Sequence, residues 1–131
     1  MVKEDYVSFE VAELLKEKGF KGQGEHFYED NKITNHPNYW FRITPIERYE
    51  AIEAPTLQIA MKWLREEKKI GIEVNIIFDL NDDNKWYYEY GFCILQLSGT
   101  YKKIAECDYD GYKTYEEACE AAIKYVLENL I

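Results

Sequence analysis

The sequence of 131 residues predicts an α+β fold in a single domain. Apolar residues recur at helical spacing near residues 9–18, 54–69 and 114–130. Between the last two of these segments, three runs rich in β-branched and aromatic residues are separated by short turn sequences. Strands joined by short turns pair with their neighbours, so we expect a three-stranded antiparallel meander within residues 55–131, with helices on one face. Residues 1–54 add an N-terminal helix and an irregular aromatic segment.

The first helix is bounded by favourable capping residues. Ser8 suits an N-cap, and Gly19 stands where a left-handed C-cap residue belongs. Residues 20–54 then mix aromatic side chains with turn formers, and only residues 27–28 and 39–43 have the composition of short strands. We expect this segment to wrap the rest of the domain, because its aromatic side chains need a surface to cover.

The second helix and the strands follow in order. Pro55 suits the first turn of the helix. The strand near residues 71–80 alternates apolar and polar residues, which is typical of a half-buried strand. Its apolar face consists of Ile72, Val74, Ile76, Phe78 and Leu80. The run at residues 85–97 is apolar on both faces and indicates a central strand in which Gly91 marks a bulge. The third strand lies near residues 100–109.

The closing helix has a capping box and a narrow apolar side. Thr114 is the predicted N-cap, and Glu117 lies three residues further on, where it completes the box. Helical geometry gathers one apolar face from Tyr115, Ala118, Cys119, Ala122, Ile123, Val126 and Leu130. Because the alanines have little bulk, this face can approach a sheet closely.

Composition and charge exclude several classes of protein. With 47% hydrophobic and 16% aromatic residues, the chain is too apolar to be disordered. The sequence lacks both the ~18-residue apolar run of a membrane helix and a signal peptide's apolar core, so we expect a cytoplasmic protein with no membrane association. The net charge is −9, and a basic stripe of the kind that grips phosphates is missing. Nucleic acid is therefore a poor fit as a partner.

From Pro55 onward, the order helix–strand–strand–strand–helix resembles a double-stranded-RNA-binding domain, and "EEACEAAIKYVLENL" is similar to the alanine-rich C-terminal helix of that family. The resemblance implies the αβββα fold. The family's Lys-Lys-x-Ala-Lys motif falls on residues 115–119, where only Ala118 matches and Glu116 and Glu117 bring negative charge. Its Gly-Pro-x-His loop falls near Asp82 and Asp83. Carboxylates at these points repel the duplex, so the RNA-contacting residues do not carry over.

Two segments, "APTLQIAMKWLREEKKIGIEV" and "YKTYEEACEAAIKYVLENLI", resemble a group of small proteins of gut Bacteroidetes and their phages or prophages. That group has no established function to carry over. The resemblance implies only a context, namely an accessory protein of a mobile element in a bacterial cytoplasm.

The sequence predicts no catalytic residue, no cofactor and no metal site. His26 and His36 lack partner ligands at metal-binding spacing, and we interpret them as surface or packed residues. The Asp79–Asp83 region lacks the glycine and the distant glutamate of a calcium loop. The three cysteines, which are interpreted as buried thiols rather than a disulfide framework, are Cys93, Cys107 and Cys119.

Aromatic residues are the remaining functional candidates: Trp40, Phe41, Trp86, Tyr87 and Tyr88. Strand alternation puts Trp86 and Tyr88 on one sheet face and Tyr87 on the other. Either residues 20–54 cover them or a partner does. The leading hypothesis is a non-enzymatic phage or prophage accessory protein that binds another protein or forms a homodimer. The alternative is a role related to nucleic acids, either acidic mimicry of DNA or residual binding of double-stranded RNA.

Overall fold

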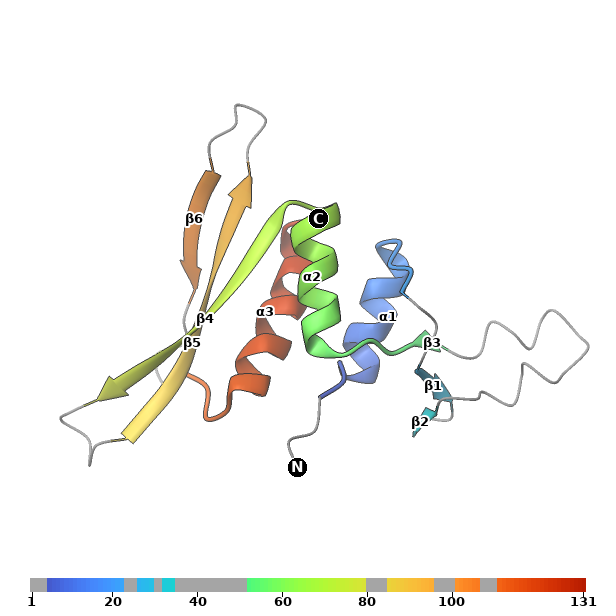
Figure 1. Cartoon of the computed structure of the whole chain (residues 1–131), viewed down its shortest axis with the longest axis horizontal. Coiled ribbons are helices and arrows are strands. Elements are labelled where there is room, and N and C mark those ends of the chain that lie inside the picture. The colour runs from blue at the N-terminus through green and yellow to red at the C-terminus, as the bar shows by residue number, and fades with distance from the viewer. Residues whose placement is uncertain are drawn as a thin grey trace, which may run out of the picture. The chain divides into compact units, whose positions relative to one another are not determined.

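A computed structural model of the chain describes residues 5–22, 26–29, 32–34, 52–79, 85–95, 101–106 and 111–131. These residues form three helices and two three-stranded antiparallel sheets, so the chain is an α+β protein (Figure 1). It divides into two compact units, residues 1–60 and 61–131. The boundary lies inside helix α2 (Leu57–Glu67), whereas the sequence predicted an internal division after residue 54.

Helix α1 (Phe9–Glu17) of the first unit has the predicted caps at both ends. The Ser8 hydroxyl accepts a hydrogen bond from the Val11 amide at 3.2 Å. At the other end, Gly19 is left-handed with φ 90°. The Gly19 amide donates to the Lys16 carbonyl, and the next amide, that of Phe20, donates to the Leu15 carbonyl. This pair of bonds is a Schellman motif, which explains why a glycine is needed there.

The first unit also contains a small sheet that the sequence did not predict in full. Strands β1 (Phe27–Glu29), β2 (Lys32–Thr34) and β3 (Ile52–Glu53) pair in the order β2-β1-β3. The predicted short strand at residues 27–28 is present as β1, whereas the prediction of an irregular segment is wrong for β2 and β3. The reason is that Phe27 is buried and the Tyr28 hydroxyl donates to the Val7 carbonyl at 2.6 Å, so β1 is anchored to the unit. The predicted strand at residues 39–43 lies outside the described residues.

A short backbone bridge ties the start of the chain to the start of α2. The Val7 amide donates to the Pro55 carbonyl, and the Leu57 amide donates to the Asp5 carbonyl. This pairing keeps the backbone at Pro55 extended, so Pro55 precedes the helix instead of lying in its first turn as predicted. The Thr56 hydroxyl then accepts a hydrogen bond from the Ile59 amide at 3.2 Å, as an N-cap does.

The sheet of the second unit contains β4 (Ile70–Asp79), β5 (Lys85–Leu95) and β6 (Tyr101–Glu106) in the order β4-β5-β6. Adjacent strands are antiparallel and pair without interruption. Gly91 pairs one to one with Glu73 on one side and Ala105 on the other. The predicted bulge at Gly91 is therefore wrong, because β5 has no extra residue between consecutive pairs with either neighbouring strand.

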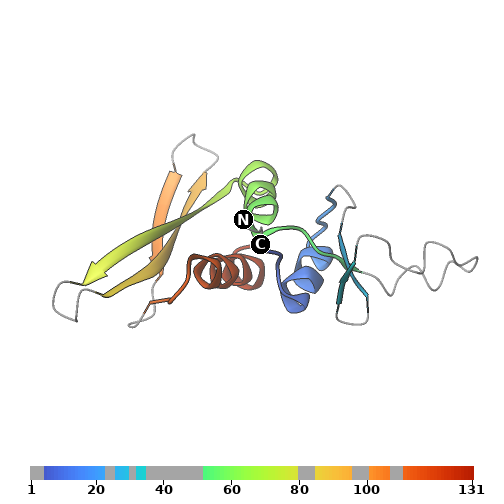
Figure 2. The same ribbon diagram turned by 60° about the horizontal axis from the view of Figure 1, so that its bottom comes forward.

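Helix α3 (Tyr115–Asn129) packs against β4 and β5 (Figures 1 and 2). The Thr114 hydroxyl accepts from the Glu117 amide at 3.1 Å, which is the hydroxyl half of the predicted capping box. The buried residues of the helix are Ala118, Cys119, Ala122, Ile123, Val126 and Leu127. Tyr115 and Leu130, which were predicted for this face, are partly exposed and lie beyond the buried stripe. No helix in the described part of the chain is long and apolar enough to cross a membrane.

Candidate functional site

The five aromatic residues predicted as an interaction surface have different outcomes. Trp40 and Phe41 lie outside the described residues. Trp86 is 62% exposed, whereas Tyr87 and Tyr88 are half-buried. The register pairs Ile76 with Tyr88 and Ile77 with Tyr87, so Trp86 and Tyr88 share one sheet face and Tyr87 lies on the other.

Tyr87 and Tyr88 both make contacts within the second unit. The Tyr88 ring lies edge-on to the Tyr115 ring of α3, with centroids 6.2 Å apart. The Tyr87 ring lies on the opposite face, against Gly111, where a Cβ atom would meet the ring. Much of the area of these two tyrosines therefore serves packing, and Trp86 is the most exposed of the three described candidates.

Two further apolar residues accompany Trp86 on the same face. Phe78 pairs directly with Trp86 across β4 and β5, and Ile76 is two residues away from Phe78 along β4. Ile76 is 62% exposed and Phe78 is 51% exposed. We call Ile76, Phe78 and Trp86 the hairpin cluster. Grouped side chains of this size at the surface are unusual, because isolated exposed apolar residues are the norm and contiguous ones mark interaction sites.

The hairpin cluster is exposed because the strands are longer than the helix that covers them. The ten residues of β4 extend roughly 33 Å, whereas the fifteen residues of α3 extend only about 22 Å. The end of the β4–β5 hairpin therefore projects beyond the N-terminal end of α3 in both views (Figures 1 and 2). The sequence predicted the correct face for Ile76 and Phe78 but wrongly predicted them to be buried. The difference in length between this strand and the closing helix was the signal in the sequence that could have shown the exposure.

The opposite face of the same hairpin is more polar. It carries Glu73 and Asn75 of β4 and Glu89 of β5, with Asn75 directly opposite Glu89. The Cys93 thiol donates a hydrogen bond to the Glu73 carboxylate, with 3.5 Å between sulfur and oxygen. This face also carries Ile77 and Tyr87, so it mixes acidic, polar and apolar side chains, whereas the face of the hairpin cluster is apolar.

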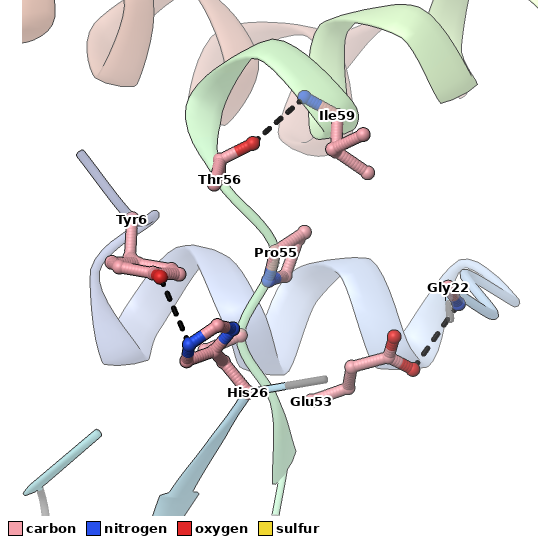
Figure 3. Close-up of a pocket in the computed structure, with 8 residues that line it drawn as sticks. Tyr6, Gly22, His26, Glu53, Pro55, Thr56 and Ile59 are labelled. Carbon is pink, nitrogen blue, oxygen red and sulfur yellow. Dashed lines mark hydrogen bonds between the residues drawn. The ribbon is translucent and has the colours of Figure 1, made fainter. Parts of the chain in front are cut away.

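The first unit contains a small hollow with a cavity volume of about 60 Å³ and a largely apolar lining (Figure 3). On its wall, the Tyr6 hydroxyl and His26 Nε2 are 3.0 Å apart, and the Glu53 carboxylate accepts from the Gly22 amide at 3.1 Å. The volume holds a few water molecules, far less than the 300 Å³ or more that encloses a typical ligand. His26 and Glu53 therefore have structural partners, in keeping with the interpretation of His26 as a packed residue.

Of the two described cysteines, Cys119 is buried as predicted, whereas Cys93 is half-buried. Cys119 is fully buried, and this burial raises the pKa of its thiol to about 11. A thiol with such a pKa stays protonated and unreactive near neutral pH. Among the described residues, no three His, Cys, Asp or Glu side chains converge as metal ligands do.

Comparison of the chain with models of protein families, with curated proteins and with solved structures found no match. The resemblances to the double-stranded-RNA-binding domain and to the Bacteroidetes proteins remain predictions from the sequence. The hairpin cluster is the strongest feature of the described residues that points to a function.

Proposed function

We propose that the protein acts by binding another protein through the hairpin cluster, as a non-enzymatic protein of the bacterial cytoplasm. The observation that supports this is the exposure of three large apolar side chains side by side, with Trp86 and Phe78 more than half exposed. Tryptophan is enriched among the residues that contribute most to binding energy at protein interfaces. The phage or prophage context suggested by the sequence fits an accessory protein of this kind.

The hairpin is well suited to present such a surface. Phe78 and Trp86 stand on paired strands, so the backbone fixes their spacing before a partner arrives. Preorganised side chains lose less conformational entropy on binding than side chains on a loop do. The neighbouring Tyr88, half-buried on the same face, extends the apolar area toward α3.

Affinity capture with matched variants tests the proposal. The bait is the full chain, compared with the double variant Phe78→Ser/Trp86→Ser. The control is Ile59→Ser, because Ile59 is 42% exposed but lies on α2 in the first unit. The proposal predicts a protein that is retained by the wild type and by the control and lost with the double variant. Identical capture by all three baits contradicts it.

The nucleic-acid alternative draws on one feature shared with the RNA-binding family, namely the order of the helices and strands. Helix α2, strands β4–β6 and helix α3 follow the αβββα order, and we propose a fold related to that domain. However, Glu116 and Glu117 are both exposed in the first turn of α3, where phosphate contact would need lysines. We expect no gel shift with double-stranded RNA even at low salt. A shift there would favour residual RNA binding over protein binding.

A further inference from the structure

Strand β4 lies at one edge of the second sheet. In the order β4-β5-β6 it is an end strand, and among the described residues its pairing partner is β5 alone. Ile70, at its start, is buried, but Asn75, Ile76 and Phe78 are exposed. The accessible part of the edge is therefore its second half, beside the hairpin cluster.

The backbone hydrogen bonds show which residues face this edge. Tyr88 and Tyr112 exchange both of their backbone bonds, at 2.8 and 2.9 Å, so the N–H and C=O of Tyr88 point away from β4. Ile76 is the residue opposite Tyr88. When two residues are opposite each other in antiparallel strands, their backbone N–H and C=O groups either point toward each other in both residues or point away in both. The N–H and C=O of Ile76 thus face the open edge, and by alternation so do those of Val74 and Phe78.

Within residues 74–78 the edge has none of the sequence features that usually prevent strand pairing. Sheet edges are normally blocked by proline, by lysine or by a bulge. Residues 74–78 read Val-Asn-Ile-Ile-Phe, and their pairing with β5 is regular throughout. Unpaired backbone groups, exposed apolar side chains and regular geometry together make a template on which a further strand can be added.

The two faces of the hairpin define the side chains that such a strand needs. Residues of an antiparallel strand opposite Val74, Ile76 and Phe78 would lie on the face of the hairpin cluster and would be apolar. The residues between them would lie on the other face, opposite Asn75 and Ile77, with Glu73 next on that face of β4 and Glu89 behind Asn75 on β5. The net charge of −9 adds to the local attraction for cations on that face.

We propose that the β4 edge binds an extended segment of a partner protein in antiparallel orientation, with apolar and basic residues alternating. This inference rests on the proposed protein-binding function and names the chemistry of the partner. A second copy of the chain fits less well. The β4 strand of a second copy has Glu73, Asn75 and Ile77 at the alternate positions, so it lacks the basic residues that this face favours.

A seven-residue peptide of alternating Lys and Val, labelled for fluorescence anisotropy, is the probe. The controls are the same composition with Lys and Val in two blocks and a peptide with Glu in place of Lys. The alternating Lys–Val peptide should bind the full chain at least about tenfold more tightly than either control. Equal binding of the alternating and the blocked peptide would show only charge attraction and would overturn the proposal.

Backbone methylation provides the sharper comparison. In an antiparallel pair the residues opposite Ile76 and Phe78 direct their N–H groups to β4, and these residues are the valines of the peptide. N-methylation of the valines should weaken binding by about tenfold or more, whereas N-methylation of the lysines should leave it nearly unchanged. Equal effects of the two methylations, or loss only with methylated lysines, overturn the antiparallel arrangement.

A matched pair of protein variants reports on the same bonds. Ile76→Ser and Ile76→Pro both remove the isoleucine side chain, but only proline removes the N–H that faces the edge. The proline variant should bind the peptide more weakly than the serine variant, with circular dichroism checking the hairpin. If proline disrupts the hairpin, the comparison of the two methylated peptides with the wild-type protein still tests the proposal.

The two proposals can fail separately. If a captured protein depends on Phe78 and Trp86 while the peptide pattern is absent, protein binding stands and strand addition is wrong. If the wild type is a dimer by light scattering and Ile76→Pro makes it a monomer, a second copy occupies the edge and the partner of alternating sequence is ruled out.

Discussion

Phe78 and Trp86 stand directly opposite each other across the β4–β5 pairing, and each is more than half exposed. A cross-strand aromatic pair stabilises a sheet by roughly 0.2–1 kcal/mol, far less than a buried side chain. We therefore expect Trp86→Ser to lower the free energy of unfolding by no more than about 1 kcal/mol, measured by urea denaturation. A loss of several kcal/mol would show that Trp86 is buried in the folded protein.

The contrast is the fully buried Ile123 of α3. Ile123→Ala removes packed methyl groups and leaves a cavity, so it should lower the free energy of unfolding by about 2–5 kcal/mol. The same urea titration measures it, and Ile123→Val serves as the graded control, with an expected loss of about 0.5–1.5 kcal/mol. Equal stability of the alanine variant and the wild type would contradict the packing of α3.

Two left-handed glycines should differ in their tolerance of alanine. Gly19 and Gly111 have φ of 90° and 63°. A Cβ atom at Gly19 would meet no atom of the described residues within 4 Å, whereas a Cβ atom at Gly111 meets the ring of Tyr87. Gly19→Ala should cost about 1–2 kcal/mol for the backbone alone, and Gly111→Ala should cost more because the ring must also move. Thermal melts compare the two, and the reverse order would contradict the position of Tyr87.

Lys69 is the one described non-glycine residue with positive φ, at 60°, two residues after α2 ends. Glycine adopts this conformation without steric cost, so Lys69→Gly should raise the stability of the protein by up to about 1 kcal/mol. The lysine side chain donates to the Glu66 carbonyl at 2.8 Å, which offsets part of the gain. Lys68→Gly is the control and should destabilise. A lower melting temperature for Lys69→Gly would contradict the prediction.

The buried thiol of Cys119 predicts a loss of stability in alkaline solution. Burial raises the pKa of its thiol from 9.0 to about 11, with Glu116 and Glu120 adding to the rise. The unfolded chain releases this proton near pH 9 and the folded chain only near pH 11, so the stabilisation is complete below pH 9 and is lost as the pH rises to 11. The loss attributable to this group is at most about 3 kcal/mol.

Cys119→Ala isolates the effect of the thiol from the other groups that titrate in alkali. The difference in unfolding free energy between wild type and Cys119→Ala should be constant below pH 9 and should shift in favour of the variant between pH 9 and 11. A difference that stays constant over the whole range would show that the thiol has no raised pKa.

Local sequence rules were enough where the determining interactions are local. Ser8 and Gly19 cap the two ends of α1 as predicted, and Thr114 caps the start of α3 as predicted. Each cap depends on neighbours within five residues. Strand alternation likewise gave the correct faces for Trp86 and Tyr87.

The failures of prediction come from partners that are distant in the sequence. Pro55 lies outside α2 because its carbonyl bonds to the Val7 amide, nearly fifty residues away. Strand β3 consists of two residues and exists only because β1 supplies its pairing partner. Ile76 and Phe78 are exposed because α3 ends before the hairpin does, and periodicity within one strand contains no information about where another element ends.

Tyr28 and Ile52 are paired on β1 and β3, although 23 residues separate them in the sequence. The two ends of this stretch are therefore held at the spacing of neighbouring strands, about 5 Å apart. Because loop-closure entropy grows only slowly with length, a change in the length of the enclosed segment changes the folding free energy little. Because β2 must keep its register with β1, we expect homologues to vary in length between Thr34 and Ile52 rather than within these two strands.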